Sequence, residues 1–225
     1  EGYDLVVADV LYFSEGIGSG MGARPTADGL NAIYFRDQRN YPIEFEEGEF
    51  PLRVERYAIR PDSGGPGYHR GGCGVVKDVR IMVDCTMSTR MDNVRFPCFG
   101  INGGGAGWPG RFTLNPRTDD ELDLPPAGEN IAVKAGDLLR VETGGGGGWG
   151  DPFTKPPEDV FRGVQEGFVS IEAALAQYGV ALTPDGLDVD ATATDAARSA
   201  ERAARPSVDR GENGREWLAR LGVAE

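Results

Sequence analysis

The sequence predicts an α+β protein: a β-rich, glycine-rich body over residues 1–150 is followed by a helical carboxy-terminal tail over residues 151–225. The distribution of glycine is the first observation, because 27 of the 34 glycines lie within residues 1–150 and seven lie beyond. Hydrophobic periodicity is the second, since it is strand-like in the body and helical in the tail. A polar stretch at 183–194, TPDGLDVDATAT, predicts a linker within the tail.

The body contains several short runs that are typical of strands. DLVVADVLYF at residues 4–13 is an almost continuous apolar run, as expected for a buried strand. VVKDVRIMVD at 75–84 has a period-two pattern with Val79, Ile81 and Val83 on one face, and the charged Lys77 and Arg80 are expected away from that face. RFTLN at 111–115 is a short strand candidate, and NIAVKAGDLLRVE at 130–142 predicts a hairpin that turns at KAGD.

The tail carries the start and stop signals of helices. Residues 151–168 place a double proline before an acidic first turn, and Gly167 suits the carboxy-terminal cap. A second helix is predicted over 170–179, where Ser170 can cap the first turn and Gly179 ends the helix.

Two further helices are predicted nearer the end of the chain, over 194–205 and 215–222. The first is rich in alanine and has little apolar stripe, which is typical of an exposed helix or one that contacts a partner. The second presents Trp217 and Leu221 on a small apolar face, and we expect this face to mediate docking.

Charge and composition argue against several classes of protein. The formal net charge is −13, and such a surface repels nucleic-acid phosphates and anionic lipid. No run approaches the ~18 uncharged apolar residues of a membrane span, and the amino end lacks the features of a secretory signal. Three cysteines without C-x-x-C spacing indicate buried, reduced thiols. We therefore expect a cytoplasmic protein that binds neither nucleic acid nor membrane.

The run TGGGGGWGDP at 143–152 could cradle a phosphate, form a tight buried turn or act as a flexible linker. A phosphate loop usually adds a lysine, and here Trp149 and Gly150 follow the glycines instead. The bulky Trp149 side chain argues against a linker, so a buried turn with positive φ angles is favoured. GAGWPG at 105–110 matches G-x-G-x-x-G, but a strand and not a helix is expected after it, which excludes a dinucleotide fold.

The densest polar cluster is RPDSGGPGYHRGGCG at residues 60–74. Asp62 and Ser63 can fix a turn through their side chains, and Arg70 offers a planar fork of donors to a carboxylate or phosphate. His69 is the sole histidine, so a histidine-rich metal site is excluded. His69 could act as a base, with Ser63 as a nucleophile, although structural roles for these side chains are the commoner outcome.

A second acidic cluster lies upstream, in YPIEFEEGEFPLRVE at residues 41–55. Carboxylates this dense can bind a metal or perform acid–base chemistry. More often such a run is solvated, and we assign no metal to this chain. The acidic residues in question are Glu44, Glu46, Glu47 and Glu49.

Three stretches in order resemble the hydantoinase B family, over roughly residues 15–182. The first runs from YPIEFEEGEF to GYHRGGCG, at residues 41–74. The second is STRMDNVRFPCFGINGGGAGWPG at 88–110, and the third begins at KAGDLLRVETGGGGGWGDP and continues through two helices to YGV, at 134–180. The family includes N-methylhydantoinase B components, one half of 5-oxoprolinase, and subunits of acetone and acetophenone carboxylases.

The resemblance implies a component of an ATP-dependent amidohydrolase or carboxylase. ATP and Mg would be held by a partner, the actin-like hydantoinase A-type ATPase subunit, and phosphorylation would activate an amide, lactam or ketone carbonyl. Family B components are longer, and the histidine- and aspartate-containing segment ahead of these motifs is missing. This chain therefore looks like the carboxy-terminal half of a B component, either as a fragment or as a split subunit. If it is a split subunit, a separate chain would carry the amino-terminal half, and any metal ion would lie on that half.

Within this chain, a set of polar residues is expected to line or brace the site, namely Asp62, Ser63, Arg70, Arg90 and Asn102. No cofactor-binding residue is assigned. The alternative interpretation is a non-catalytic assembly protein that supports the active site of partner chains.

Overall fold

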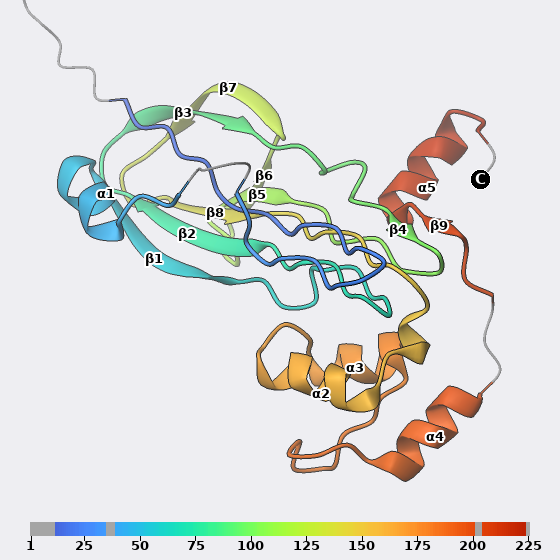
Figure 1. Cartoon of the computed structure of the whole chain (residues 1–225). Helices are drawn as coiled ribbons and strands as arrows, with labels where there is room; N and C mark the ends of the chain where they lie inside the picture. The colour runs from blue at the N-terminus through green and yellow to red at the C-terminus, as the bar shows by residue number, and fades with distance from the viewer. Residues whose placement is uncertain (1–11, 35–38, 201–203, 224–225) are drawn as a thin grey trace, which may run out of the picture.

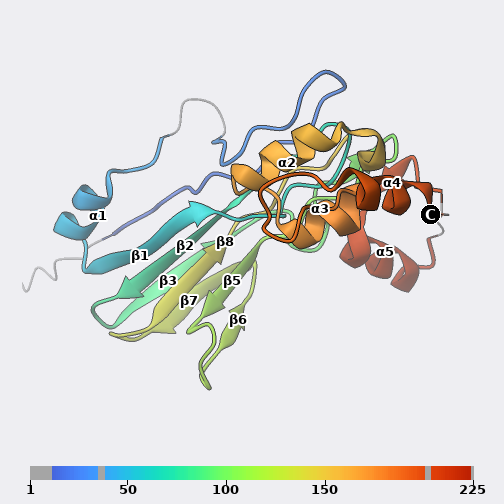
Figure 2. The same cartoon turned by 90° about the horizontal axis from the view of Figure 1, so that it is seen from below.

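The computed structural model describes residues 12–34, 39–200 and 204–223 and confirms the α+β class (Figure 1). The strand predicted at 4–13 lies mostly outside the described residues. Strands and glycine-rich segments fill one part of the molecule, and the helices of the tail gather at the end of the sheet opposite to the helix over Ile43–Glu49 (Figure 2).

A five-stranded antiparallel sheet has the order β1-β2-β8-β5-β6. Its strands are β1 (Leu52–Ile59), β2 (Val75–Ile81), β5 (Arg111–Leu114), β6 (Leu122–Leu124) and β8 (Leu138–Glu142). The strand expected at 111–115 is therefore confirmed as β5. The helix α1 (Ile43–Glu49) precedes β1 and packs against it.

A second pair of strands, β3 (Cys85–Arg90) and β7 (Ala127–Val133), forms a separate antiparallel ribbon. An apolar core joins the ribbon to the sheet, with Leu114, Leu124 and Val133 buried in it. The hairpin expected at 130–142 is therefore wrong, because β7 pairs with β3 whereas β8 pairs with β2 and β5. The KAGD turn forms, but it carries the chain from the ribbon into the sheet.

Strand β2 is buried on both faces over most of its length. Lys77, expected to face away from the core, is in fact 1% exposed. Its ammonium lies 2.8 Å from the buried carboxylate of Glu46 in α1 and also contacts Glu15. Glu46 is therefore buried and not solvated, contrary to the expectation for its acidic run. The burial of Lys77 is possible because Glu46 of α1 and Glu15 of the amino-terminal segment supply its counter-charge.

The glycine-rich segments form a bundle in which backbones lie directly against one another. Segments near residues 18–23, 29–33, 63–74, 98–108 and 144–148 exchange backbone hydrogen bonds, for example from Gly20 N to Gly144 O at 2.9 Å. The run 144–148 is buried, and none of its glycines has a positive φ. The prediction of a turn with positive φ is therefore wrong: these positions need glycine because neighbouring backbone occupies the space that a Cβ would fill.

The first helices of the tail follow the local signals closely. A short 3₁₀ turn (Pro152–Thr154) leads into α2 (Pro157–Gln165), and Gly167 has a φ of 75° just after the helix. Helix α3 (Ile171–Tyr178) is capped by the Ser170 hydroxyl, which accepts from Ala173 N at 3.0 Å, and is ended by Gly179 in the left-handed conformation. Both helices pack around a core formed by Val160, Val169, Ala173, Ala174, Tyr178 and Val180.

The remainder of the tail returns to the body. The stretch expected as a linker forms a tight loop closed by a bridge between Leu182 and Val189, and α4 (Ala191–Ser199) begins before that stretch ends. Further on, β9 (Val208–Asp209) pairs with β4 (Gly100–Ile101) of the body, and α5 (Gly211–Arg220) follows. The division at residue 150 stays a prediction.

The apolar face at the end of the chain is partly used within the molecule. The Trp217 ring lies 6.3 Å from that of Phe96 and 5.0 Å from the guanidinium carbon of Arg95, whereas Leu221 is exposed. A docking role for this face stays a prediction, and normal assembly by a chain truncated after Gly186 would contradict it.

Two expectations from composition have structural counterparts. Among the described helices, none is both long and apolar enough to cross a membrane. The three cysteines are free thiols, but only Cys73 is buried, while Cys98 is half-buried and Cys85 is exposed, so the expected burial holds for one of them.

Candidate functional site

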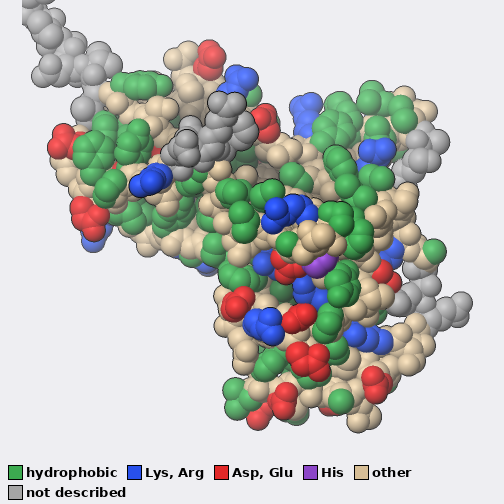
Figure 3. Space-filling model, in the orientation of Figure 1, with side chains coloured by type: hydrophobic (Ala, Val, Ile, Leu, Met, Phe, Trp, Pro, Cys, Tyr) green, Lys and Arg blue, Asp and Glu red, His purple; other side chains and the backbone are tan. Residues whose placement is uncertain are grey.

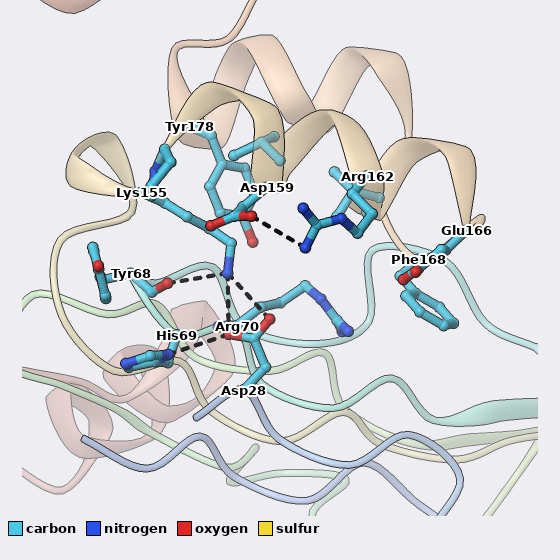
Figure 4. Close-up of a pocket in the computed structure, with 14 residues that line it drawn as sticks. Asp28, Tyr68, His69, Arg70, Lys155, Asp159, Arg162, Glu166, Phe168 and Tyr178 are labelled. Atoms are coloured by element: carbon cyan, nitrogen blue, oxygen red, sulfur yellow. Dashed lines mark hydrogen bonds and ion pairs between the residues drawn. The ribbon is translucent and has the colours of Figure 1, made fainter. Parts of the chain in front are cut away.

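A cavity of 380 Å³ lies between the glycine-rich body and the helices α2 and α3. The space-filling view shows charged side chains of both signs and the single histidine gathered in the hollow between these two parts (Figure 3). Polar residues from three separate parts of the sequence line it, namely Asp28, Tyr68, His69, Arg70, Lys155, Asp159, Arg162, Glu166 and Tyr178 (Figure 4).

The Asp28 carboxylate organises one wall of the cavity. It accepts from the backbone N of Arg70 at 2.8 Å and from the Lys155 ammonium at 3.0 and 3.1 Å. The Lys155 ammonium also donates to the Tyr68 carbonyl, and His69 Nδ1 lies 3.5 Å from Asp28. Lys155 is thereby held as the counter-ion of Asp28, and the imidazole of His69 stands at the same carboxylate.

Arg70 forms the floor of the cavity and is 7% exposed. Its Nη1 donates to the Gly71 carbonyl at 2.6 Å and to Cys73 Sγ at 3.1 Å, while Asn31 Oδ1 lies 3.3 Å from both Nη1 and Nη2. One face of the guanidinium lies 5.0 Å from the centre of the Phe168 ring. Among the described residues no carboxylate lies within salt-bridge distance of Arg70.

Tyr178 reaches the cavity from α3 with its hydroxyl directed toward Arg70 and Lys155 (Figure 4). The side chain is 2% exposed, and no hydrogen bond to the hydroxyl is formed within the described part of the chain. Burial raises the pKa of the Tyr178 phenol well above its usual value. The hydroxyl therefore stays protonated at neutral pH and is available as a hydrogen-bond donor.

The mouth of the cavity carries a more exposed set of charges on α2. Arg162 Nη1 lies 3.3 Å from Asp159 Oδ1, one helical turn away, and both side chains are largely solvent-accessible. Glu166 follows at the end of the helix and is exposed. These three side chains leave one negative charge at the mouth, whereas the inner part holds two cations, Arg70 and Lys155, against the single carboxylate of Asp28.

The structure brings Asp62 and Ser63 near this cavity but uses both for the backbone. Asp62 has a φ of 61°, and its carboxylate accepts from Ser170 N at 2.7 Å, which ties the loop to the start of α3. The Ser63 hydroxyl is fully buried, donates to the Arg60 carbonyl at 2.6 Å and accepts from Gly74 N at 3.0 Å. In this geometry neither side chain faces a ligand.

Arg90 and Asn102 lie elsewhere in the molecule. Arg90 is exposed at the end of β3, opposite Ala127 of the ribbon. Asn102 follows β4 with a φ of 55°, and its backbone N donates to the Ser207 carbonyl at 2.7 Å. Of the five residues singled out in the sequence, only Arg70 lines the cavity, and a role for the other four at a site formed with partner chains stays a prediction.

Sequence reasoning missed the residues that complete the cavity, namely Asp28, Lys155 and Tyr178. Asp28 lies in an ordinary loop, and Lys155 precedes a double proline that attracts attention only as a helix start. Tyr178 has the spacing of a core residue of α3, and its ring is indeed in the core. The 127 positions between Asp28 and Lys155 leave no local pattern to detect.

The glycine run does not provide a phosphate cradle. Amides of Gly145, Gly146 and Gly148 already donate to carbonyl oxygens of Trp108, Gly72 and Gly105. A phosphate loop needs successive free amides directed at the ligand, and three of the five amides of this run are occupied by the bundle. The described residues also contain no group of three or more histidine, cysteine or acidic side chains placed to hold a metal ion.

Comparison with known proteins identifies the family that shares this sequence. The family model described as hydantoinase B/oxoprolinase matches residues 6–152. The chain is 33% identical over 180 residues to the putative B component of the D-/L-hydantoinase of Pseudomonas sp. strain NS671, covering 79% of this chain and 30% of that protein. The chain belongs to the hydantoinase B/oxoprolinase family.

Two further relatives extend the match into the helical tail. The chain is 30% identical over 209 residues to the beta subunit of the caprolactamase of Pseudomonas jessenii, covering 87% of this chain and 34% of that subunit. The crystal structure of the ATP-dependent caprolactamase from that organism superposes with a TM-score of 0.65 at 28% identity, over 82% of this chain and 33% of the other. Nucleotide-free acetone carboxylase shares the fold, with a TM-score of 0.58 at 20% identity over 92% of this chain and 30% of its own. The chain thus spans about a third of the length of these proteins.

Proposed function

We propose that this chain is the carboxy-terminal part of the B component of an ATP-dependent amidohydrolase or carboxylase, either as a split subunit or as a piece of a longer chain. In the proposed hydrolysis, phosphorylation of an amide or lactam oxygen turns it into a leaving group, so that water adds to the carbon and phosphate departs. In the proposed carboxylation, the phosphorylated ketone serves as an enolate equivalent that keeps its oxygen and attacks activated bicarbonate, with release of phosphate. The observation that supports this most is the match to about a third of a hydantoinase B component and of a caprolactamase beta chain.

The proposed division of labour puts the nucleotide on another chain. An actin-like A-type ATPase subunit would hold ATP and Mg, and the amino-terminal part of the B component would hold any metal ion. Three of the five amides of the glycine run are occupied by the bundle, which supports this arrangement. We propose a cytoplasmic location and neither nucleic acid nor membrane as a partner, in keeping with the net charge of −13.

Native mass spectrometry of the protein purified from its source without overexpression tests the proposal. The expected result is a complex that contains an ATPase subunit and the remainder of the B component, with ATP-dependent turnover of lactams, or of ketones in the presence of bicarbonate. A chain that travels alone at 24.1 kDa would overturn the proposed function.

A second candidate, a protein that only supports assembly, is favoured by the way Asp62 and Ser63 hold backbone rather than face a cavity. The variant Lys155→Met separates the two functions. Loss of turnover in a complex of normal composition would support a catalytic contribution of the cavity, whereas normal turnover by that complex would favour the assembly role. The matched control is Lys134→Met, in the exposed turn between β7 and β8.

A further inference from the structure

One edge of the Arg70 guanidinium is unused within the described chain. The Gly71 carbonyl and Cys73 Sγ engage Nη1, and the Asn31 amide oxygen sits at the end between Nη1 and Nη2. Nε–H and the second hydrogen of Nη2 find no acceptor among the described residues. These two donors form the side-on edge of arginine, which binds a carboxylate through two parallel hydrogen bonds.

The Tyr178 hydroxyl supplies a second unused donor in the same cavity. Its ring is locked in the core of the tail, so the hydroxyl is held in place at little cost in conformational entropy. A ligand atom in the cavity that accepts from this hydroxyl would complete its hydrogen bonding. Arg70 and Tyr178 therefore present three unused donors to the cavity: Nε–H and one Nη2–H of the guanidinium, and the phenolic O–H.

The charge distribution selects the charge of the ligand. The inner cavity holds Arg70 and Lys155 against Asp28, which leaves one positive charge uncompensated among these three side chains. At the mouth, Arg162 pairs with Asp159, and Glu166 adds a negative charge that opposes the entry of a dianion more strongly than that of a monoanion. The volume of 380 Å³ lies at the lower end of the range for small-molecule pockets.

We propose that this cavity is a binding site for a small monocarboxylate, held by the side-on edge of Arg70 and the hydroxyl of Tyr178. Lys155 contributes positive charge from its place on Asp28. The site goes beyond the proposed function, because binding to this chain can be measured without ATP, a partner protein or turnover.

The test follows the Arg70 Nε–H signal by ¹⁵N-edited NMR while acetate is added to the purified chain at constant ionic strength. We expect a saturable shift, with acetate binding in the millimolar range, and a Kd about tenfold weaker in Tyr178→Phe, since a hydrogen bond to a charged group is lost. Tyr41→Phe is the matched control, because this substitution removes an equivalent hydroxyl outside the cavity. Tyr41 lies half-exposed beside α1. Arg70→Lys keeps the charge but removes the two-donor edge together with the Nε–H signal. In this variant the backbone amide signals of the other residues that line the cavity are followed instead, and they should show no saturable shift.

Three results would overturn the proposal. One is the absence of a saturable shift up to about 100 mM acetate beyond that given by chloride. Another is equal affinity in the wild-type protein and in Tyr178→Phe. The third is tighter binding of phosphate dianion than of acetate, which would contradict the charge argument. None of these outcomes bears on the assembly with an ATPase, so failure here is distinguishable from failure of the proposed function.

Discussion

Substitution of Gly146 by alanine tests whether the glycine run is required for backbone contact. A Cβ at this position would lie 2.0 Å from the Met21 carbonyl oxygen and 2.5 Å from Gly22 N. Non-bonded contacts to carbon are comfortable near about 3.5 Å, so the two segments would have to part by roughly 1.5 Å. Neither neighbour is a flexible side chain that could turn aside.

The cost of that movement can be worked from the hydrogen bonds at the same residue. Gly146 N donates to Gly72 O at 2.9 Å, and Gly146 O accepts from Gly65 N at 2.8 Å. A shift of this size breaks at least one of the two and leaves buried polar groups without partners, at about 1–3 kcal/mol. Adding about 1–3 kcal/mol for overpacking gives a loss of roughly 2–6 kcal/mol in the free energy of unfolding, with a central value of about 4 kcal/mol.

Urea denaturation followed by tryptophan fluorescence measures this loss. For an m-value of about 2–3 kcal/mol/M, the midpoint should fall by about 1–2 M. Gly48→Ala is the control, because a Cβ there meets nothing within 4 Å and alanine favours the helix α1. A Gly146→Ala protein whose unfolding free energy stays within about 0.5 kcal/mol of the wild type would refute the reasoning.

Three further predictions concern charges and caps. Burial raises the pKa of Glu15, so its carboxylate opposes folding once it is ionised. Glu15→Gln should therefore raise the free energy of unfolding at pH 7. In urea melts at a series of pH values, this gain should vanish as the pH falls below 4.5. Arg140→Ala leaves the buried Asp78 without its two 2.7 Å hydrogen bonds, and it should lower the free energy of unfolding by about 3–5 kcal/mol in the same melts. A decrease of less than about 1 kcal/mol would contradict this prediction. Ser170→Ala removes the cap of α3 and should cost about 1 kcal/mol, with Ser199→Ala, at the last residue of α4, as a control of small effect.

The sign for Glu15 follows from the direction of the shift. A carboxyl whose pKa is raised by folding binds its proton more tightly in the native state than in the unfolded state. Its contribution to stability is therefore complete below the unfolded pKa and is lost as the pH rises through the folded value. Lys77 can neutralise only one of the two buried carboxylates, Glu15 and Glu46, which explains why removing a charge should help.

Local signals predict the tail well because its helix ends are decided by neighbouring residues. Ser170 caps α3 through an amide three positions away, and Gly167 and Gly179 take left-handed conformations at the ends of their helices. The body is harder to predict, since its pairing is decided at long range. Nothing within residues 130–142 indicates that β7 joins β3 and that β8 joins β2.

The same limit applies to burial and to the cavity. By period two, Lys77 shares a face with Val79 and Ile81, so the expectation that it faces outward depends on its charge alone. Its burial requires Glu46 and Glu15, which come from distant segments. Arg70 can be singled out because a planar donor in a glycine-rich loop is unusual. Asp28 and Tyr178 cannot, because each has an ordinary local context and acquires its role only when α2 and α3 close over the loop.

The glycine bundle also sets the order in which the molecule can be completed during synthesis. Its central segment, residues 144–148, contacts segments that the ribosome has released long before, and the hydrogen bond from Thr143 Oγ1 to Gly18 O joins positions 125 apart. Loops this long close slowly, because their entropy is lost before the contacts form. A nascent chain that ends before residue 144 therefore holds four glycine-rich segments but lacks the central segment that they contact. We expect it to remain open, sensitive to proteases and dependent on chaperones until the last piece emerges.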